Sequence, residues 1–238
     1  MRFDILTLFP EVCRAYCEES ILGRAQRAGK LEIMVHNIRD YTKDKHGRVD
    51  DYPYGGGNGM VMQPQPVLDC IRAVRGEREA KVCYLSPKGE RFSQQTAAQL
   101  SQMSDLILLC GHYEGIDQRI LDSEVDFELS LGDFVLTGGE LPALAVVDAV
   151  ARLLPGVLAA DACYEEESLQ GGLLEYPQYT RPPVYEGMEV PDILLSGDHA
   201  KIASWRRNEA LRITKERRPD LLKTAELDRE DLRALENL

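Results

Sequence analysis

Residues 111–142 read GHYEGIDQRILDSEVDFELSLGDFVLTGGELP, and this stretch decides the fold of the chain. It follows the apolar run 106–110, which is typical of a buried strand. Two glycine-bearing turns lie within it, Gly111–Gly115 and Gly132–Gly139, and each follows a predicted strand. Because an open α/β sheet presents backbone amides and carbonyls to a ligand at such strand ends, we expect the active site at these turns.

Strands and helices alternate on either side of this stretch. Strands are predicted at Arg2–Phe9, Leu31–Asn37, Lys81–Leu85 and Asp105–Cys110. Helices are predicted at Glu11–Arg27 (one or two), Pro64–Arg75, Ser93–Gln102 and Leu141–Leu153. This rhythm predicts an α/β domain with a mostly parallel sheet covered on both faces, so the turns that begin near Tyr84 and Gly111 should lie at the same edge.

The chain changes character after residue 158. Residues 159–170 read AADACYEEESLQ, an acidic stretch without periodicity that is typical of an interdomain linker. We therefore divide the chain into an α/β domain at 1–158, a linker at 159–174 and a small all-helical domain at 175–238. The small domain contains a basic helix around Trp205 and an amphipathic helix from Asp228. Trp205 is expected to pack in the core of this domain.

Charge is distributed unevenly along the chain. The formal net charge of −12 argues against a protein that coats nucleic acid with a uniformly positive surface. Between His199 and Lys223, however, there are eight Lys or Arg residues and only three acidic ones. Such a basic segment on an acidic body can dock a polyanion, although a solvated helix face is the commoner reason for a charge run.

Composition is that of an ordinary soluble protein. Of the 238 residues, 44% are hydrophobic and 29% are charged, and no apolar run approaches the length of a membrane span. The N-terminus MRFDILTLFP carries Asp4 inside its apolar run and lacks a small-residue cleavage site, so it resembles a first strand more than a signal peptide. We expect a cytoplasmic protein without a membrane segment.

The six cysteines are scattered, with no CxxC pair and no histidines at zinc-finger spacing. They are Cys13, Cys17, Cys70, Cys83, Cys110 and Cys163. Cys83 and Cys110 lie inside predicted strands, where a free thiol behaves as a small hydrophobic group. We expect structural thiols and no metal site.

A long polar loop, residues 39–60, separates the second strand from the next helix. It contains DKHGRVDDYPYGGGNGM and is too long for a simple connection. Four glycines in five positions, between Gly55 and Gly59, allow close backbone approach to a flat or anionic group. Neither the Walker pattern nor the third glycine of a dinucleotide fingerprint is present. The residues alone leave open a flexible connection or a binding loop.

Six motifs resemble those of the TrmD family of bacterial tRNA (guanine-N1)-methyltransferases. They are VDDYPYGGGNGM, YLSPKG, GHYEGID, SLGDFVLTGGELPA, YTRP and LLSGDHAKIASWR. Each alone is modestly specific, but all six occur in the right order, and the similarity extends from Phe9 to the arginines after Trp205. The resemblance implies a SPOUT fold, in which the C-terminal part of the α/β domain is threaded into a trefoil knot. General rules of chain topology would have excluded a knot.

The resemblance also implies the reaction and its partners. Members of the family transfer a methyl group from S-adenosylmethionine to N1 of the guanosine 3′ of the anticodon, position 37 of tRNA. They form homodimers with sites between the subunits, and the small C-terminal domain helps to grip tRNA. Magnesium is a further requirement that the family suggests, although the sequence contains no dedicated cage and tRNA itself binds the ion.

By resemblance, three segments form the S-adenosylmethionine pocket. Its residues are Tyr84, Leu85, Ser86, Pro87, Gly111, Tyr113, Glu114, Gly115, Leu131, Gly132, Asp133, Phe134, Val135, Leu136, Gly138 and Gly139. The glycines bring backbone groups within hydrogen-bonding range of adenine and ribose, and Glu114 offers a carboxylate to the sulfonium or the guanine edge. The leucines supply apolar walls, although leucines at such positions also serve as core residues.

The transfer needs a base, because N1 of guanine is protonated at neutral pH, and a cation for the charge that develops at O6. By resemblance the cation is Arg152, although an arginine there also suits the dipole of a helix C-terminus. The family's usual base is an aspartate before a Ser-Phe pair; here residues 165–169 read EEESL, so we assign the base to Glu167. Its extra methylene shifts the carboxylate, and a misplacement of about 1 Å can cost about a hundredfold in rate, so Glu165 and Glu166 are alternatives.

Substrate contacts are expected by resemblance in three places. They are Tyr54, Gly55, Gly56 and Asn58 of the glycine loop, Glu175 and Gln178 near YTRP, and Ser196, Gly197, His199, Lys201, Arg206 and Arg207 of the small domain. Among them Lys201, Arg206 and Arg207 are the expected phosphate ligands. Asn58 stands where many relatives have proline or alanine, and Gln178 where some have histidine.

Three other functions compete with this one. A ribose 2′-O-methyltransferase of the same fold needs an activated hydroxyl and usually an Arg or Asn near the first knot turn, whereas the glycine loop and the linker acid favour base methylation. A module that binds S-adenosylmethionine and tRNA without catalysis is suggested by glutamate in place of the usual aspartate. A metal-dependent hydrolase that uses the acidic linker lacks a supporting histidine cluster.

Overall fold

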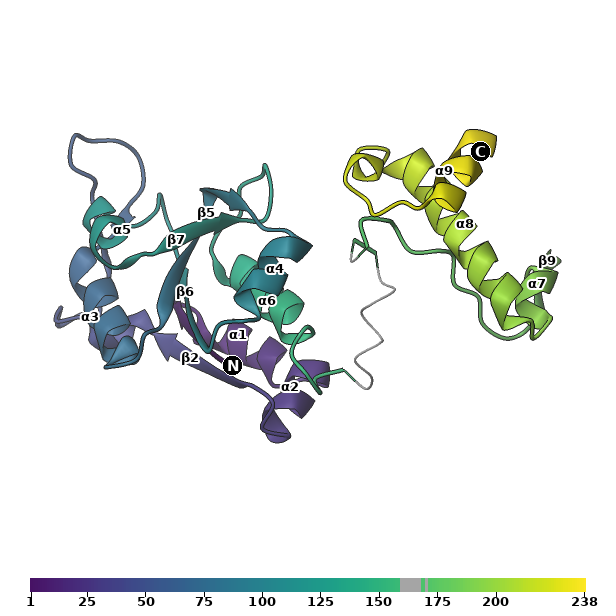
Figure 1. Ribbon diagram of the computed structural model, residues 1–238. Coiled ribbons are helices and arrows are strands. Elements are labelled where there is room, and N and C mark those ends of the chain that lie inside the picture. Colours follow the sequence, from purple (N-terminus) through teal and green to yellow (C-terminus); the bar gives the residue numbers. More distant parts are fainter. Residues whose placement is uncertain (159–167, 170) are drawn as a thin grey trace. The chain divides into compact units, whose positions relative to one another are not determined.

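A computed structural model of the chain describes residues 1–158, 168, 169 and 171–238 (Figure 1). The chain divides into two compact units, residues 1–159 and 160–238. The first unit is an α/β structure and the second is mostly helical. Each unit is described by itself.

A five-stranded parallel sheet with the order β2-β1-β6-β5-β7 forms the centre of the first unit. Its strands are β1 (Arg2–Thr7), β2 (Glu32–Asn37), β5 (Lys81–Arg91), β6 (Asp105–Cys110) and β7 (Phe127–Ser130). Apart from its first residue, β6 is buried throughout, as expected for a central parallel strand covered on both faces. The predicted α/β fold with a mostly parallel sheet is confirmed.

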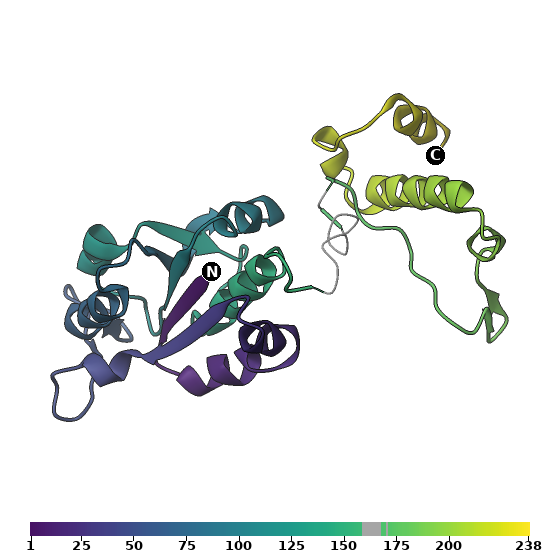
Figure 2. The same ribbon diagram turned by 60° about the horizontal axis from the view of Figure 1, so that its bottom comes forward.

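Helices cover both faces of this sheet (Figures 1 and 2). One face carries α1 (Pro10–Cys17), α2 (Ser20–Arg27), α4 (Gln94–Leu100) and α6 (Glu140–Ala151). The other carries α3 (Pro64–Arg75), α5 (Gln118–Glu124) and the short helix η1 (Ile38–Tyr41). The sequence did not predict α5, a seven-residue helix that lies between the two glycine-bearing turns.

β5 is longer than predicted, since it continues to Arg91. Its pairing with β7 shifts register between Leu85 and Glu90, since both residues face Leu129, so the ladder is interrupted there. Gly89 allows the close contact there, because a Cβ at this position would lie 2.5 Å from the carbonyl carbon of Glu128. The strand is therefore irregular at the point where it reaches the predicted site.

A fully buried carboxylate, Asp4 of β1, binds side chains from β1, β2 and the segment before β5. Arg2 donates two hydrogen bonds of 2.9 Å to it, Arg78 donates one of 2.9 Å, and His36 Nε2 lies 2.7 Å from Oδ1. Burial by itself would raise the pKa of Asp4, but the hydrogen bonds from His36, Arg2 and Arg78 outweigh it and hold the pKa well below its ordinary value of 3.8. The ionised form therefore stabilises the fold.

We predict that Asp4→Asn lowers the free energy of unfolding by about 3 kcal/mol, because it leaves partly buried arginines without their counter-charge. Because the pKa of Asp4 is lower in the folded than in the unfolded chain, its carboxylate stabilises the fold at any pH above the unfolded pKa, and this stabilisation is lost as the pH falls toward the folded pKa. The free energy of unfolding of the wild type should therefore begin to fall below about pH 4. The variant should lack this part of the loss. Urea unfolding at several pH values measures both effects. Glu32→Gln, which removes an exposed partner of Arg2, should change stability by less than about 1 kcal/mol; an equal loss in both variants would contradict the argument.

The second unit has a small core of its own around Leu173, Ala210 and Leu211. Its elements are α7 (Asp192–Leu195), α8 (His199–Arg217), η3 (Leu221–Lys223), α9 (Arg229–Asn237) and a hairpin of β8 (Val184–Tyr185) and β9 (Met188–Glu189). The sequence predicted helices here but not the hairpin. Trp205 does not belong to this core, so the prediction that it packs there was wrong.

Two short strands, β3 (Asp50–Asp51) and β4 (Val61–Met62), pair with each other on either side of the glycine loop. The loop is thus closed at its base by backbone hydrogen bonds. Among the helices of the described residues, none has the length and apolar character that a membrane crossing requires.

Candidate active site

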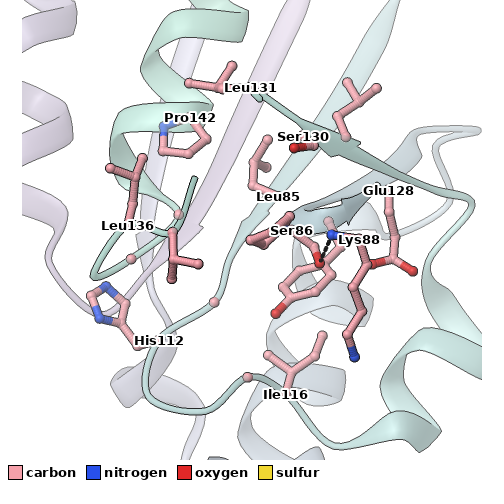
Figure 3. A pocket seen from close by; sticks show the side chains of 18 of the residues that line it. Leu85, Ser86, Lys88, His112, Ile116, Glu128, Ser130, Leu131, Leu136 and Pro142 are labelled. Atoms are coloured by element: carbon pink, nitrogen blue, oxygen red, sulfur yellow. Dashed lines mark hydrogen bonds between the residues drawn. The ribbon is translucent and has the colours of Figure 1, made fainter. Parts of the chain in front are cut away.

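A pocket of about 340 Å³ opens at the ends of β6 and β7, beside the irregular part of β5 (Figure 3). Residues 84–88, 111–116 and 128–139 line most of it. Figure 3 shows Leu131, Leu136 and Pro142 on one side of the pocket and Ser86 and Glu128 on the other. The three segments that were predicted to lie at one edge of the sheet therefore line the same pocket.

All the residues predicted to bind the cofactor line this pocket except Asp133. The side chain of Asp133 is 93% exposed and forms an ion pair of 2.7 Å with Arg91. This ion pair holds the Asp133 carboxylate at the surface, while the neighbouring turn is closed by the Ser130 hydroxyl, which accepts a hydrogen bond from Gly132 N and donates one to Gly132 O. The contacts of the other residues with a cofactor stay predictions.

Several lining residues were not predicted. They are Lys88, His112, Ile116, Gln118, Leu121, Glu128, Leu129, Ser130, Thr137 and Pro142. Lys88, His112 and Ile116 lie inside the quoted motifs, so motif membership was a signal that could have found them. No local pattern marks Glu128, since only the pairing of β7 with β5 brings it to the pocket.

The third segment returns to the end of β6. Gly139 N donates a 3.0 Å hydrogen bond to Gly111 O, and His112 forms an antiparallel bridge with Gly138. A Cβ at Gly139 would lie 2.7 Å from the Cα of Cys110. Since that neighbour is backbone, only glycine permits this approach.

A buried hydrogen-bonded network supports the same turn. Glu140, the first residue of α6, accepts a hydrogen bond of 2.5 Å from Thr7 Oγ1, and His112 Nε2 lies 2.8 and 2.9 Å from its two oxygens. The side chain of Glu140 is only 9% exposed, and a carboxylate is favourable at the N-terminus of a helix. The network therefore joins β1, the turn after β6 and α6.

Two polar groups of the pocket are available to a ligand. Burial, together with the charge of Glu128, raises the pKa of Tyr84 to about 12, so its phenol stays protonated at neutral pH. Glu128 Oε2 is buried and has no hydrogen-bond partner in the described part of the chain. An orphaned buried carboxylate oxygen suits a ligand that donates a hydrogen bond.

The glycine loop reaches the second segment of the pocket. Met60 O accepts a hydrogen bond of 3.0 Å from Glu114 N, and Gly59 lies against the Glu114 side chain. The predicted substrate contacts Tyr54, Gly55, Gly56 and Asn58 are all exposed. Gly55 and Gly56 have φ values of +86° and +79°, which explains the need for glycine at these positions.

The predicted substrate residues of the second unit have contacts within that unit. Gln178 Nε2 donates to Glu175 Oε1 at 2.6 Å, and Lys201 pairs with Asp198 at 3.0 Å. Arg207 donates two hydrogen bonds, of 2.9 and 2.6 Å, to Asp231. Arg207 is therefore engaged in holding α9 to α8, whereas no acidic partner engages Arg206 among the described residues.

The remaining predicted residues of this unit lie near the start of α8. Ser196 Oγ donates to Ile193 O at 2.7 Å, Gly197 has a φ of +72°, and His199 is the first residue of the helix. Asp198 caps this helix by accepting a hydrogen bond from Lys201 N.

Of the two predicted catalytic residues, the structure describes one. Arg152 is the C-cap of α6, where its backbone N donates to Asp148 O at 3.2 Å. Glu167 and its alternatives Glu165 and Glu166 lie outside the described residues. In the described part of the chain, no three His, Cys, Asp or Glu side chains form a cluster that could hold a metal ion.

Comparison with known proteins identifies the family. The family model described as tRNA (Guanine-1)-methyltransferase TrmD matches residues 1–224. The chain belongs to the TrmD family. It is 54% identical over 245 residues to the tRNA (guanine-N(1)-)-methyltransferase of Alkaliphilus oremlandii, covering 100% of this chain and 98% of that protein.

Two further relatives of the TrmD family carry the same name. The protein of Caldanaerobacter subterraneus is 57% identical over 235 residues, covering 99% of this chain and 97% of its own. The protein of Clostridioides difficile is 55% identical over 226 residues, covering 94% and 98%. The similarity to these TrmD relatives therefore includes both units of the chain.

We predict that Gly139→Ala destabilises the chain by about 1–3 kcal/mol and abolishes binding of S-adenosylmethionine, because the methyl group would enter the backbone of β6. Urea unfolding and calorimetric titration measure the two effects. Gly171→Ala is the matched control, since a Cβ there would have nothing within 4 Å. Wild-type stability and affinity in Gly139→Ala would show that the close approach does not shape the pocket.

Proposed function

We propose that the chain is an S-adenosylmethionine-dependent tRNA methyltransferase that modifies N1 of the guanosine 3′ of the anticodon. The observation that carries this proposal is the convergence of three TrmD motifs on one pocket at the carboxyl edge of the sheet. Relatives more than half identical to the chain over nearly its whole length are named tRNA (guanine-N(1)-)-methyltransferase.

The lining of the pocket suits S-adenosylmethionine. Leu85, Leu131 and Leu136 provide apolar walls, and the open Glu128 oxygen accepts a hydrogen bond from a hydroxyl or ammonium donor. The glycine-only approach at Gly139 places backbone groups beside the pocket. When bound, the cofactor supplies a methyl group on a positively charged sulfur.

The chain's own residues then do two things for the reaction. Glu167 removes the proton from N1 of guanine, which exposes the nitrogen lone pair to the methyl group. Arg152 donates hydrogen bonds to O6, where negative charge develops as the proton leaves. Glu114 and the glycine loop hold the guanosine beside the pocket, and the second unit grips the tRNA.

We further propose the trefoil knot of the SPOUT fold. The support is the path of the chain, which leaves the edge strand β7 and comes back across β5 to the end of β6. From there α6 packs with α1 on one face of the sheet. The contact between Gly139 and Cys110 is where the returning segment passes the end of β6.

A homodimer is part of the same proposal. Four large apolar side chains on or next to α1 and α6 are each about half exposed or more. They are Phe9, Val12, Tyr16 and Leu141. Exposed apolar side chains that gather on packed helices favour a protein interface. The cytoplasm, where tRNA is found, is the proposed location, and magnesium is assigned to the tRNA rather than to a protein site.

The first test measures transfer of labelled methyl from S-adenosylmethionine to tRNA transcripts with G or A after the anticodon. Wild type should methylate only the G transcript. Glu167→Gln should reduce the rate at least about a hundredfold, since it removes the general base. Glu165→Gln and Glu166→Gln are the matched controls and should retain activity.

The other outcomes assign the function differently. A rate that survives in Glu167→Gln and falls in one of the neighbouring variants would move the base to that residue. Methylation of ribose would favour the 2′-O-methyltransferase. Binding of both substrates without any transfer by wild type would identify a non-catalytic binding module.

For Arg152→Gln we predict a fall in kcat of about 10²–10³-fold with little change in KM, because charge at O6 develops only as the reaction proceeds. The competing role, a favourable charge at the C-terminus of α6, would cost only about 0.5 kcal/mol of stability. Steady-state kinetics and thermal unfolding of the same variant distinguish the two. A lower melting temperature with unchanged kcat would assign Arg152 to the helix alone.

A further inference from the structure

A cavity of about 770 Å³ lies entirely within the second unit. Three aromatic residues, three prolines, four aliphatic residues and two arginines form most of its lining. None of the lining residues is acidic, although the chain has a net charge of −12. Its size is that of a site for a small molecule or for one nucleotide, and its lining suits an aromatic, anionic group.

The aromatic side chains of the cavity are Tyr176, Tyr179 and Trp205. The rings of Tyr179 and Trp205 lie 6.5 Å apart at an angle of 52°, and the guanidinium of Arg206 lies 4.7 Å from the centre of the Tyr176 ring. Tyr179 is 48% exposed, Trp205 is half-buried, and both side chains line the cavity. These rings are therefore accessible, and stacking on them would accept any base.

One cation of the cavity, Arg206, has no acidic partner among the described residues. Several other cations of α8 have acidic partners: Arg207 binds Asp231, and Arg212 binds Glu209 and Glu216. Arg206 forms no ion pair in the described part of the chain, and its Nε is buried without a hydrogen-bond partner. A buried donor without an acceptor is unfavourable, so an incoming acceptor oxygen would stabilise this arrangement.

We propose that this cavity binds one unpaired nucleotide of the tRNA substrate, with its base against Trp205 and Tyr179 and its phosphate at Arg206. The inference rests on the proposed function and adds a second recognition site, apart from the pocket at the end of the sheet. Only an unstacked base can enter, because in a duplex both faces of a base are covered by its neighbours. A loop of the tRNA is therefore the part that this cavity recognises.

Trp205 is the single tryptophan of the chain, so its fluorescence reports on this cavity alone. A tRNA transcript titrated into the full-length protein should quench this fluorescence in a saturable manner. A fully paired RNA duplex of the same length should leave it unchanged at the same concentrations. Equal quenching by both RNAs would overturn the proposal, because it would show electrostatic contact rather than stacking.

A variant series measures what the stacking contributes. Tyr179→Ala should raise the KM for tRNA about tenfold with kcat within about twofold of wild type, the size expected for one stacked base. Tyr179→Phe should restore the KM, because it keeps the ring. Asn208→Ala, an exposed change on α8 outside the cavity, should behave as wild type; an unchanged KM in Tyr179→Ala would overturn the proposal.

The two readouts separate this inference from the proposed function. Methyl transfer by wild type with no response of Trp205 and no effect of Tyr179→Ala would remove the cavity as a tRNA site and leave the function intact. Selective quenching by tRNA without methyl transfer would retain the cavity and remove the function. Fluorescence that changes on dilution of the protein, and not on addition of RNA, would assign the cavity to a second copy of the chain and overturn the inference.

Discussion

A Cβ at Gly139 would lie 2.7 Å from the Cα of Cys110 and 3.0 Å from the nitrogen of Gly111. Neither atom can move aside, because Cys110 ends a strand that is buried from both faces of the sheet. The backbone of the returning segment therefore lies so close to the end of β6 that no side chain fits between them. The hydrogen bond from Gly139 N to Gly111 O pairs the two backbone groups that face each other there. The segment after β6 and the segment after β7 both line the pocket, so the pocket forms only when these two segments are in contact.

The two ends of the site are built in different ways. Around the pocket, buried contacts such as those of Glu140 with Thr7 and His112 hold the turns in place before any ligand arrives. The glycine loop, in contrast, carries the fully exposed Tyr54 and glycines in left-handed conformations. On the proposed function, the preorganised pocket lowers the entropy cost of binding the cofactor, whereas the exposed loop pays the cost of ordering its side chains when tRNA binds.

Sequence patterns predicted the parts of this structure that depend on local chemistry. The apolar run ending at Cys110 predicted a central strand, and the glycines predicted where backbone segments approach each other. The environments of Asp4, Glu128 and Trp205 could not be predicted from the sequence, because they are formed by residues distant in the chain. Asp4, for example, is buried with a partner 74 positions away. The base assigned to Glu167 rests on motif alignment alone, since it lies outside the described residues.

Ion pairs reduce the positive charge that the basic segment of the second unit can offer to a ligand. Arg207, Arg212 and Arg218 are each bound to carboxylates, so this part of α8 and the turn after it present less positive charge than their sequence suggests. A polyanion would thus be attracted weakly by an acidic chain, and affinity would depend on a few phosphate contacts and on stacking. Few phosphate contacts mean a shallow dependence on salt and weak binding to duplex RNA. On the proposed function, that balance favours the loops of tRNA, where unpaired bases and the guanosine to be methylated are found.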